Sequence, residues 1–393
     1  MTNIERIIIL YPADTSPERV SKPGNYSLSR LLIYLHELGA TPIVLFNKTE
    51  RSERWGNIEF IQLNPLTVLR FLRKSAFRQR SLIVMQMGAH HLYARFLRMA
   101  MPGSRVLVRL GGVYYKREYL ESASFRREAR VLRRQFSVAD MIISTADGTP
   151  VDLFMQKVGV APERYRKWLN GFPVIPNHGN HERSDRIVCI SRLHRGKYVD
   201  AVLRAYASAL PRLSRPHSLR IVGDGPERAN LDALAKDLGV ADLVEFSGHS
   251  DDVGPHLYSS KLLVSGLANN PLMEAIVTGT PIVTAEWGEV RTLYGGFPNV
   301  NVVDCPHLGF GPGPAANVSV FVERTADMIV QVLNHYPRLD AQRTGGQVLY
   351  SWADRLTDEL NLCGDLFDSK TEVQRHDRED DHGSRRRRNS STL

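Results

Sequence analysis

Two basic side chains, five positions apart, follow an apolar run in the second half of the chain. The segment Ser191-Arg192-Leu193-His194-Arg195-Gly196-Lys197 comes directly after Ile187 to Ile190, a run suited to a buried parallel strand. Arg192 offers a planar guanidinium and Lys197 a compact ammonium, and cations at the start of a helix can neutralise a diphosphate. Basic loops are common, so this pattern does not by itself identify a ligand.

A glycine-containing turn follows the next apolar run. Gly223-Asp224-Gly225-Pro226-Glu227 comes after Ser218 to Val222. Glycine permits a tight turn and the close approach of another backbone or a ligand, and proline suits the start of a helix. The turn is compatible with a ligand contact at Gly223 and equally with a connection that touches no ligand.

The third segment with the chemistry of a ligand site is Asn269-Asn270-Pro271-Leu272-Met273-Glu274. Asn270 is a good helix N-cap and Pro271 fits the first helical position. The free backbone N–H groups near Leu272 and Met273 would then point outwards with the positive end of the helix dipole, which predicts an anion site. Glu274 lies in the first turn, where its carboxylate can accept hydrogen bonds from ribose hydroxyls. An acid is also favoured there by helix electrostatics alone.

These segments end strands in an alternation of apolar runs and helical patterns. Such alternation predicts an α/β fold with a doubly wound parallel sheet, which binds ligands beyond the carboxyl ends of its strands. The expected strands are 187–190, 218–222, 244–247, 261–265 and 281–285, and the expected helices are 198–210, 227–238, 253–259 and 271–278.

The first half of the chain has the same alternation. Leucines at helical spacing between Leu28 and Leu38 predict a helix that Gly39 ends. The expected strands are 6–11, 41–46, 81–85, 105–110 and 141–144.

The alternation breaks near Asn170-Gly171, and a turn-rich stretch follows. We therefore expect two Rossmann-like domains. From Ser369 onward the chain is poor in apolar residues and carries four consecutive arginines, which predicts disorder. The expected division is a first domain over 1–172, a second over 173–345, a terminal helix over 346–368 that packs back on the domains, and a disordered tail over 369–393.

The three segments, in this order on one domain, resemble those of the retaining family-4 glycosyltransferases, also called glycosyl transferases group 1. The resemblance runs from Asn170-Gly171 to about Tyr294 and is carried by SRLHRGKYVDAVLRAY, LRIVGDGPER and the stretch from Leu243 to Val283. It implies the GT-B fold, in which two Rossmann-like domains face each other across a cleft.

The resemblance also implies an activity and a donor site. Such an enzyme moves a sugar from a nucleotide-diphosphate donor to an acceptor hydroxyl, with retention and without a metal, in cell-surface polysaccharide or glycolipid biosynthesis. Arg192 and Lys197 would hold the diphosphate, and Glu274 the ribose. The backbone of 270–273 would hold the distal phosphate, and the region from Phe246 to Asp252, which includes Gly248, would cover the base. No cofactor is expected, because the nucleotide sugar is a substrate.

The sequence departs from the family pattern in two places. Gly266 stands eight positions before Glu274, where the family has a first glutamate near the donor sugar. Asn269 and Asn270 can offer amide groups instead.

The first domain departs as well. The family has His-Gly after a strand near the reacting sugar, and this chain has Leu110-Gly111. We expect His91, with His90 as the alternative, or Arg109 to serve there. A surface or core histidine is the competing interpretation. Gly24 and Asn25 are expected in a loop on the acceptor side.

The net charge of +9 is unevenly distributed. Between Arg51 and Asp140, 18 basic residues face 6 acidic ones, a surplus of 12. Such a surface attracts anions. Nucleic-acid binding would require interleaved aromatic platforms or a reading module, which the sequence lacks. We expect peripheral contact with an anionic membrane, and a solvated surface is the alternative.

Composition is that of a globular protein, with 42% hydrophobic and 24% charged residues. No apolar run reaches the roughly 20 residues of a membrane span, and three dispersed cysteines favour a reducing compartment. We expect a cytoplasmic protein, at the inner face of the plasma membrane. A nucleotide-sugar epimerase of GT-B fold, and a non-catalytic protein that binds a nucleotide sugar or a partner enzyme, remain alternatives.

Overall fold

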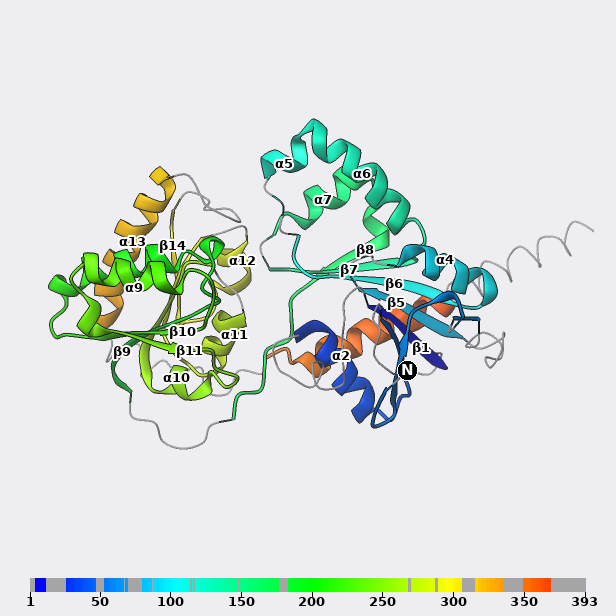
Figure 1. The fold of residues 1–393 in the computed structure, drawn as a ribbon, viewed down its shortest axis with the longest axis horizontal. Helices are drawn as coiled ribbons and strands as arrows, with labels where there is room; N and C mark the ends of the chain where they lie inside the picture. Colours follow the sequence, from blue (N-terminus) through cyan, green and yellow to red (C-terminus); the bar gives the residue numbers. More distant parts are fainter. Residues whose placement is uncertain are drawn as a thin grey trace, which may run out of the picture.

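The computed structural model describes two α/β lobes, each built on its own sheet (Figure 1). The chain passes to the second lobe after the last strand of the first sheet and later returns to the first lobe. The two crossings lie side by side, because Phe172 N–H donates to the Tyr350 carbonyl at 2.8 Å and Phe172 forms a parallel β-bridge with Ser351. The described residues are 4–11, 26–46, 53–66, 68–69, 80–86, 88, 90–113, 115, 117–147, 149–176, 183–267, 270–286, 289–305, 315–335 and 349–368.

The first sheet has eight strands in the order β3-β4-β2-β1-β5-β6-β7-β8. Its pairings are parallel except that β3 is antiparallel to β4, so β3 forms an antiparallel edge. Apolar runs make the central strands, which are buried on both faces as parallel strands require. The strands are β1 (Arg6–Tyr11), β2 (Ile43–Phe46), β3 (Glu53–Trp55), β4 (Ile58–Gln62), β5 (Ser81–Gln86), β6 (Arg105–Leu110), β7 (Met141–Thr145) and β8 (Tyr165–Trp168).

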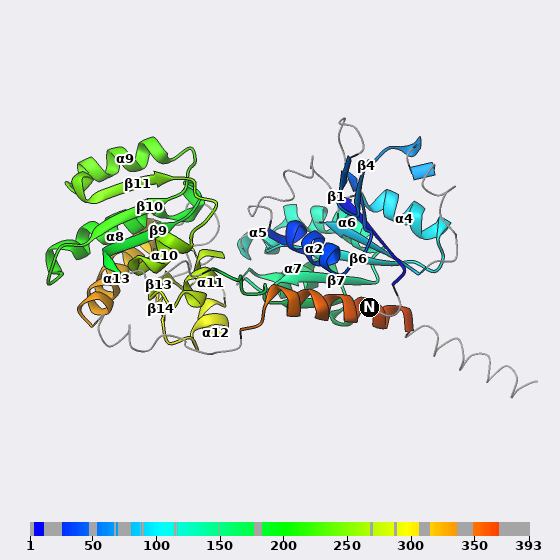
Figure 2. The same ribbon diagram turned by 90° about the horizontal axis from the view of Figure 1, so that it is seen from below.

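Helices cover the two faces of this sheet. One face packs against α2 and a helix at 352–368 that returns from the second lobe; Figure 2 shows that helix along the first lobe. The other face packs against α4, α6 and α7. The helices of this lobe are α2 (Tyr26–Glu37), α4 (His91–Ala100), α5 (Arg117–Glu121), α6 (Ala123–Phe136) and α7 (Val151–Val158).

The second sheet has six parallel strands in the order β11-β10-β9-β12-β13-β14. The strand order reverses between β9 and β12, and such switch points are where open α/β sheets bind ligands. The strands are β9 (Ser184–Ile190), β10 (Ser218–Val222), β11 (Val244–Gly248), β12 (Ser260–Ser265), β13 (Ile282–Ala285) and β14 (Val300–Val303), and the helices are α8 (Val199–Ala209), α9 (Arg228–Asp237), α10 (Gly254–Tyr258), α11 (Asn270–Val277), α12 (Val290–Tyr294) and α13 (Ala315–Asn334).

The predicted two-sheet, doubly wound α/β fold is confirmed. Every strand expected from the sequence forms, and Gly39 follows the first predicted helix at a positive φ of 70°. The sequence interpretation missed β3, β4, β8 and β14, which are short edge or near-edge strands, and also the 20-residue helix α13. The tail beyond 368 lies outside the described residues.

The helix at 352–368 is held to the first sheet by buried ion pairs. Arg109 Nε lies 2.6 Å from Glu359 Oε1, and Arg355 Nη1 donates to Glu359 Oε2 at 2.9 Å. The Arg355 guanidinium also stacks over the Trp168 ring. Arg105 Nε donates to the Leu366 carbonyl near the end of the helix. The charged network therefore fixes this helix on the first lobe rather than on the second.

Candidate functional site

Four loops meet at the carboxyl edge of the second sheet. They follow β9, β10, β11 and β12, the strands on either side of the switch point. Gly223 N–H donates to the Gly248 carbonyl at 2.7 Å, which joins the loops after β10 and β11. Leu193 N–H donates to the Asp224 carbonyl at 2.9 Å, which joins the loops after β9 and β10. The structure thus brings the three sequence segments together.

Gly223 is required by close backbone packing. At its φ of 138°, an added Cβ would lie 1.9 Å from the Ser191 carbonyl oxygen. At Gly225, an added Cβ would lie 2.4 Å from the Leu193 carbonyl oxygen. These glycines therefore hold the basic loop against the turn, whether or not Gly223 also touches a ligand.

Lys197 and Arg192 are neighbouring cations without a partner. Neither side chain makes a hydrogen bond or an ion pair with any residue of the described segments. Lys197 is half-buried and Arg192 is exposed. Burial, and then the charge of Arg192, lower the pKa of the Lys197 ammonium to about 8 against the opposing effect of Asp147. A desolvated ammonium beside a guanidinium is unfavourable unless an anion binds there.

Helix α11 presents its N-terminal end to the same edge. The helix begins at Asn270, one residue earlier than expected, so Asn270 is its first helical residue rather than the N-cap. Leu272, Met273 and Glu274 are buried. Since the side chains of Leu272 and Met273 are buried, a phosphate could meet only their backbone, and phosphate binding there stays a prediction. The Glu274 side chain is buried as well and is not an open carboxylate.

Gly266, at the start of the loop that leads to α11, touches the basic loop. An added Cβ at Gly266 would lie 2.8 Å from Tyr198 Cβ and 3.0 Å from the Lys197 carbonyl oxygen. Tyr198 is buried and has a left-handed backbone, with φ of 54°. The position where the family has a glutamate therefore has no room for a side chain while Tyr198 keeps this conformation.

The first lobe contributes Asp147, from the loop after β7, to the surroundings of Lys197. The charge of Asp147 opposes the lowering of the Lys197 pKa, and it adds to burial, the larger cause, in raising the pKa of the Tyr294 hydroxyl of the second lobe. Thr149 Oγ1 donates to Asp147 Oδ1 at 2.6 Å and so orients this carboxylate. Lys197 consequently lies on the side of its lobe that faces the first lobe.

The two candidate histidines lie where α4 begins, after β5. His90 has a left-handed backbone and its Nε2 donates to the Tyr11 carbonyl at 3.1 Å, at the end of β1. His91 is the first residue of α4 and is partly exposed. Burial, and then the charge of Arg95, lower the pKa of His91. Both histidines are at the carboxyl edge of the first sheet, and a catalytic role for His91 stays a prediction.

Arg109 is not placed for catalysis. Its side chain is 5% exposed and pairs with Glu359 of the returning helix. The sequence interpretation expected a catalytic role because Arg109 directly precedes Leu110-Gly111. The partner lies about 250 residues away in the sequence, so only the folded chain reveals it. We assign Arg109 to the attachment of the helix at 352–368.

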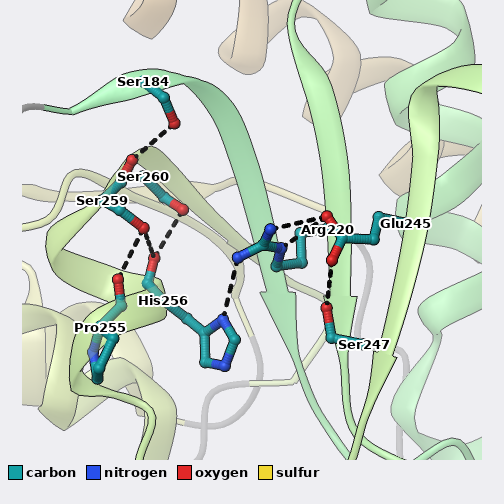
Figure 3. Close-up of polar contacts among 8 residues, drawn as sticks. All are labelled: Ser184, Arg220, Glu245, Ser247, Pro255, His256, Ser259 and Ser260. Atoms are coloured by element: carbon teal, nitrogen blue, oxygen red, sulfur yellow. Dashed lines mark hydrogen bonds and ion pairs between the residues drawn. The ribbon is translucent and has the colours of Figure 1, made fainter.

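A second polar cluster in the second lobe has satisfied charges (Figure 3). Arg220 on β10 donates from Nε and Nη2 to Glu245 Oε2 at 2.9 and 2.8 Å, and its Nη1 donates to His256 Nδ1 at 3.5 Å. Ser247 donates to the other Glu245 oxygen at 3.0 Å. Since the arginine already has a counter-charge, this cluster does not resemble an anion site.

Several predicted features are not tested by this geometry. Gly24, Asn25 and Asn269 lie outside the described residues. In the described part of the chain, no group of three or more His, Cys, Asp or Glu side chains is arranged to hold a metal ion. The helices in that part are all too short or too polar to cross a membrane.

The second lobe matches a known family. Residues 184–301, which hold all four loops, match the family model described as glycosyl transferases group 1. This confirms the family resemblance of the basic loop, the glycine turn and the loop that leads to α11.

Two curated proteins are similar over shorter stretches. The chain is 41% identical over 70 residues to the lipopolysaccharide core biosynthesis glycosyltransferase LpsE of Rhizobium meliloti, which covers 17% of this chain and 21% of LpsE. It is 31% identical over 130 residues to N-acetyl-alpha-D-glucosaminyl L-malate synthase of Bacillus anthracis, 31% of each protein. The chain thus matches between 21% and 31% of the length of these relatives.

Solved structures are similar over nearly the whole chain. Sucrose-phosphate synthase of Thermosynechococcus elongatus has 16% identity and a TM-score of 0.66, covering 93% of this chain and 100% of that chain. HepE of Anabaena in complex with UDP has 16% identity and a TM-score of 0.60, covering 90% and 99%. The group 1 domain and its partner lobe therefore have the GT-B fold, as predicted.

Three residues of the site escaped sequence reasoning: Asp147, Tyr198 and Tyr294. Asp147 and Tyr294 meet the site only through tertiary structure. Tyr198 carried one signal, because it follows Lys197 where the family segment has a glycine, and such a glycine is typical of a left-handed backbone.

Proposed function

We propose that this protein is a glycosyltransferase that moves a sugar from a nucleoside-diphosphate sugar to an acceptor hydroxyl. The observation that carries the proposal is that Arg192 and Lys197, at the switch point of a lobe that matches the group 1 model, make no side-chain hydrogen bond or ion pair with the described residues. A diphosphate would supply the directly bound counter-charge that neither side chain has among the described residues. HepE, which has the same fold, holds UDP, and this supports a uridine nucleotide as the first donor to test.

The proposed chemistry uses charge that grows during the reaction. As the bond between the sugar and the diphosphate breaks, negative charge accumulates on the leaving phosphate and the sugar becomes oxocarbenium-like. Lys197, Arg192 and the N-terminal end of α11 then interact more strongly with the transition state than with the ground state. We propose that these groups replace a metal and that the sugar is transferred with retention.

The proposed acceptor is a saccharide or a lipid-linked saccharide in cell-surface polysaccharide or glycolipid biosynthesis. LpsE acts in lipopolysaccharide core biosynthesis by its name, and this relative supports the choice of pathway. We propose a cytoplasmic site of action at the inner face of the plasma membrane. His91, at the carboxyl edge of the first sheet, is the proposed contact on the acceptor side.

The test is a thermal-shift panel of nucleotide sugars, including UDP-glucose, UDP-N-acetylglucosamine and GDP-mannose. A ligand at one hundred times its Kd stabilises the folded protein by about 2.7 kcal/mol. We expect one nucleotide series to raise Tm in the wild type and to lose that effect in Arg192→Ala and Lys197→Ala. In a transfer assay, each variant should lower kcat/KM by roughly 10²- to 10³-fold, by analogy with a lost oxyanion donor.

Arg195→Ala is the matched control, because Arg195 lies in the same loop but pairs with Glu227 at 3.2 Å. This variant should keep the ligand-induced shift. No shift with any nucleotide, or equal loss in all three variants, would contradict the proposal. Donor binding without turnover on any acceptor would instead favour a non-catalytic binding protein. Gly266 motivates this alternative, because a glutamate side chain has no room at that position.

A further inference from the structure

Helix α4 exposes an apolar stripe on the first lobe. Leu92, Phe96 and Met99 are 67%, 42% and 73% exposed, and their spacing of four and three residues puts them on one side of the helix. Ala94 and Leu97 are buried on the opposite side, against the sheet. The stripe is therefore not needed for packing, and large exposed apolar side chains in a contiguous row indicate a contact surface.

Arginines accompany this stripe on α4 and on the neighbouring α6, and one of them, Arg98, pairs with Asp140 at 2.9 Å. Helices α4 and α6 carry two and five arginines, and Arg95 ties the helices together by donating to the Arg134 carbonyl at 3.3 Å and to Ser137 Oγ at 2.5 Å. The only acid on the two helices is Glu128, whose carboxylate accepts the Tyr115 and Tyr119 hydroxyls at 2.5 and 2.8 Å. The arginines of α6, which are all exposed, are Arg126, Arg127, Arg130, Arg133 and Arg134.

We propose that α4 and α6 form a membrane-docking face that lies on an anionic lipid bilayer. Leu92, Phe96 and Met99 would enter the boundary between headgroups and acyl chains, and the arginines would contact lipid phosphates. A helix with apolar side chains on one face and basic residues beside them is the pattern of an interfacial helix. The inference rests on the proposed function in one respect: docking would bring the donor site close to a lipid-linked acceptor.

The chemistry of this face favours a bilayer over other anionic partners. A nucleic acid would use aromatic platforms for stacking, whereas Tyr115 and Tyr119 are tied to Glu128 and stack on each other with centroids 5.7 Å apart. An apolar stripe adds nothing to a phosphate backbone contact, but in a bilayer it adds hydrophobic transfer to the electrostatic attraction. The opposite face of the sheet is covered by α2 and the helix at 352–368, so the docking face is on one side only.

The first experiment is co-sedimentation of the full chain with vesicles of phosphatidylcholine alone or with about one third phosphatidylglycerol. The wild type should bind the anionic vesicles only. Arg127→Gln/Arg130→Gln/Arg134→Gln should weaken binding on the order of a hundredfold, at roughly fivefold per arginine near the surface. Leu92→Gln/Phe96→Gln/Met99→Gln should weaken it at least about tenfold. Leu38→Gln is the control, because Leu38 is an exposed leucine of the same lobe that follows α2.

A site-specific probe gives the second readout. Cys189, Cys305 and Cys363 are all buried, so a cysteine placed at the surface can be labelled selectively. An environment-sensitive fluorophore on Phe96→Cys should shift to the blue with anionic vesicles, and the same label on Leu38→Cys should not. All variants should keep the wild-type Tm and its shift with nucleotide sugar, which separates this inference from the donor site.

Three outcomes would overturn the docking face. The first is that the wild type binds neutral and anionic vesicles equally. The second is that the label at position 96 does not respond to anionic vesicles. The third is that the apolar triple variant turns a dimer into a monomer while vesicle binding is unchanged. The last result would assign the stripe to a contact between copies of the chain. Loss of donor binding with intact vesicle binding would count against the proposed function alone.

Discussion

Basic side chains behave differently in the two lobes. In the first lobe, Arg105 and Arg109 point from a central strand to the helix at 352–368 and are engaged by it. In the second lobe, Arg192 and Lys197 lie at the end of a strand and make no side-chain hydrogen bond or ion pair with the described residues, although the charge of Asp147 acts on Lys197. Both pairs follow from similar sequence, a basic residue in or after an apolar run. The two pairs differ in whether the fold supplies a hydrogen-bonding or ion-pair partner. Arg192 and Lys197 have none among the described residues, so they are the pair that an anionic ligand could contact.

The two regions also differ in how they are held together. The first lobe fixes its C-terminal helix through long charged side chains in a buried network. The second lobe fixes its loops through backbone contacts so close that Gly223, Gly225 and Gly266 leave no room for a Cβ. Substitutions should therefore act through lost charge pairs in one region and through steric overlap in the other.

The largest effect should follow from Glu359→Gln in the first lobe. The substitution removes the buried counter-charge of Arg109 and Arg355, whose side chains are both 5% exposed. Breaking a buried pair by removing one partner typically costs about 3–5 kcal/mol. Urea denaturation should show this loss of unfolding free energy. Glu227→Gln, which removes the partner of the exposed Arg195, should leave the midpoint nearly unchanged. Similar urea midpoints for Glu359→Gln and Glu227→Gln would show that the buried ion pair contributes no more to stability than the exposed one.

A smaller effect should follow from Gly266→Ala in the second lobe. The new Cβ would overlap Tyr198 and the Lys197 backbone, and overpacking of this kind costs about 1–3 kcal/mol. Nucleotide-sugar affinity should fall with stability, because Lys197 is displaced. The penalty should shrink in a Tyr198→Gly background, since glycine suits the left-handed backbone and removes the overlapping Cβ. Gly296→Ala is the control, as an added Cβ there meets nothing within 4 Å. An equal loss of unfolding free energy from Gly266→Ala in the wild-type and Tyr198→Gly backgrounds would contradict the steric explanation.

The smallest effect is a pH dependence of donor binding. The pKa of Lys197 is about 8, so its ammonium is charged below that pH and loses its proton above it. A diphosphate prefers the charged form, and the Kd of the nucleotide sugar should therefore rise by up to about tenfold per pH unit above 8. Calorimetric titration between about pH 7 and 10 measures this. Lys197→Arg should bind with little pH dependence, because guanidinium stays protonated. A wild-type Kd that is constant over this range would show that Lys197 does not face the phosphates.

Sequence reasoning was strongest where local pattern and chemistry coincide. The strands of the second lobe, the glycine turn and the position of the basic loop follow from apolar runs and from residues that terminate them. It was weaker at sheet edges, because strands such as β3 and β8 are short and partly polar, and it missed α13 because no loop chemistry drew attention to that segment. It also placed the start of α11 one residue late, within the usual uncertainty of helix ends.

The amino-acid sequence by itself determined the α/β class, the order of the three loop segments and the family resemblance of the second lobe, since these depend on spacing along the chain. Only the tertiary structure decided which cations are available. It paired Arg109 with a residue about 250 positions away, left Lys197 half-buried with no hydrogen bond or ion pair to the described part of the chain, and packed Tyr198 against Gly266. Charge pairing and steric exclusion depend on distances in space, and the sequence states only distances along the chain.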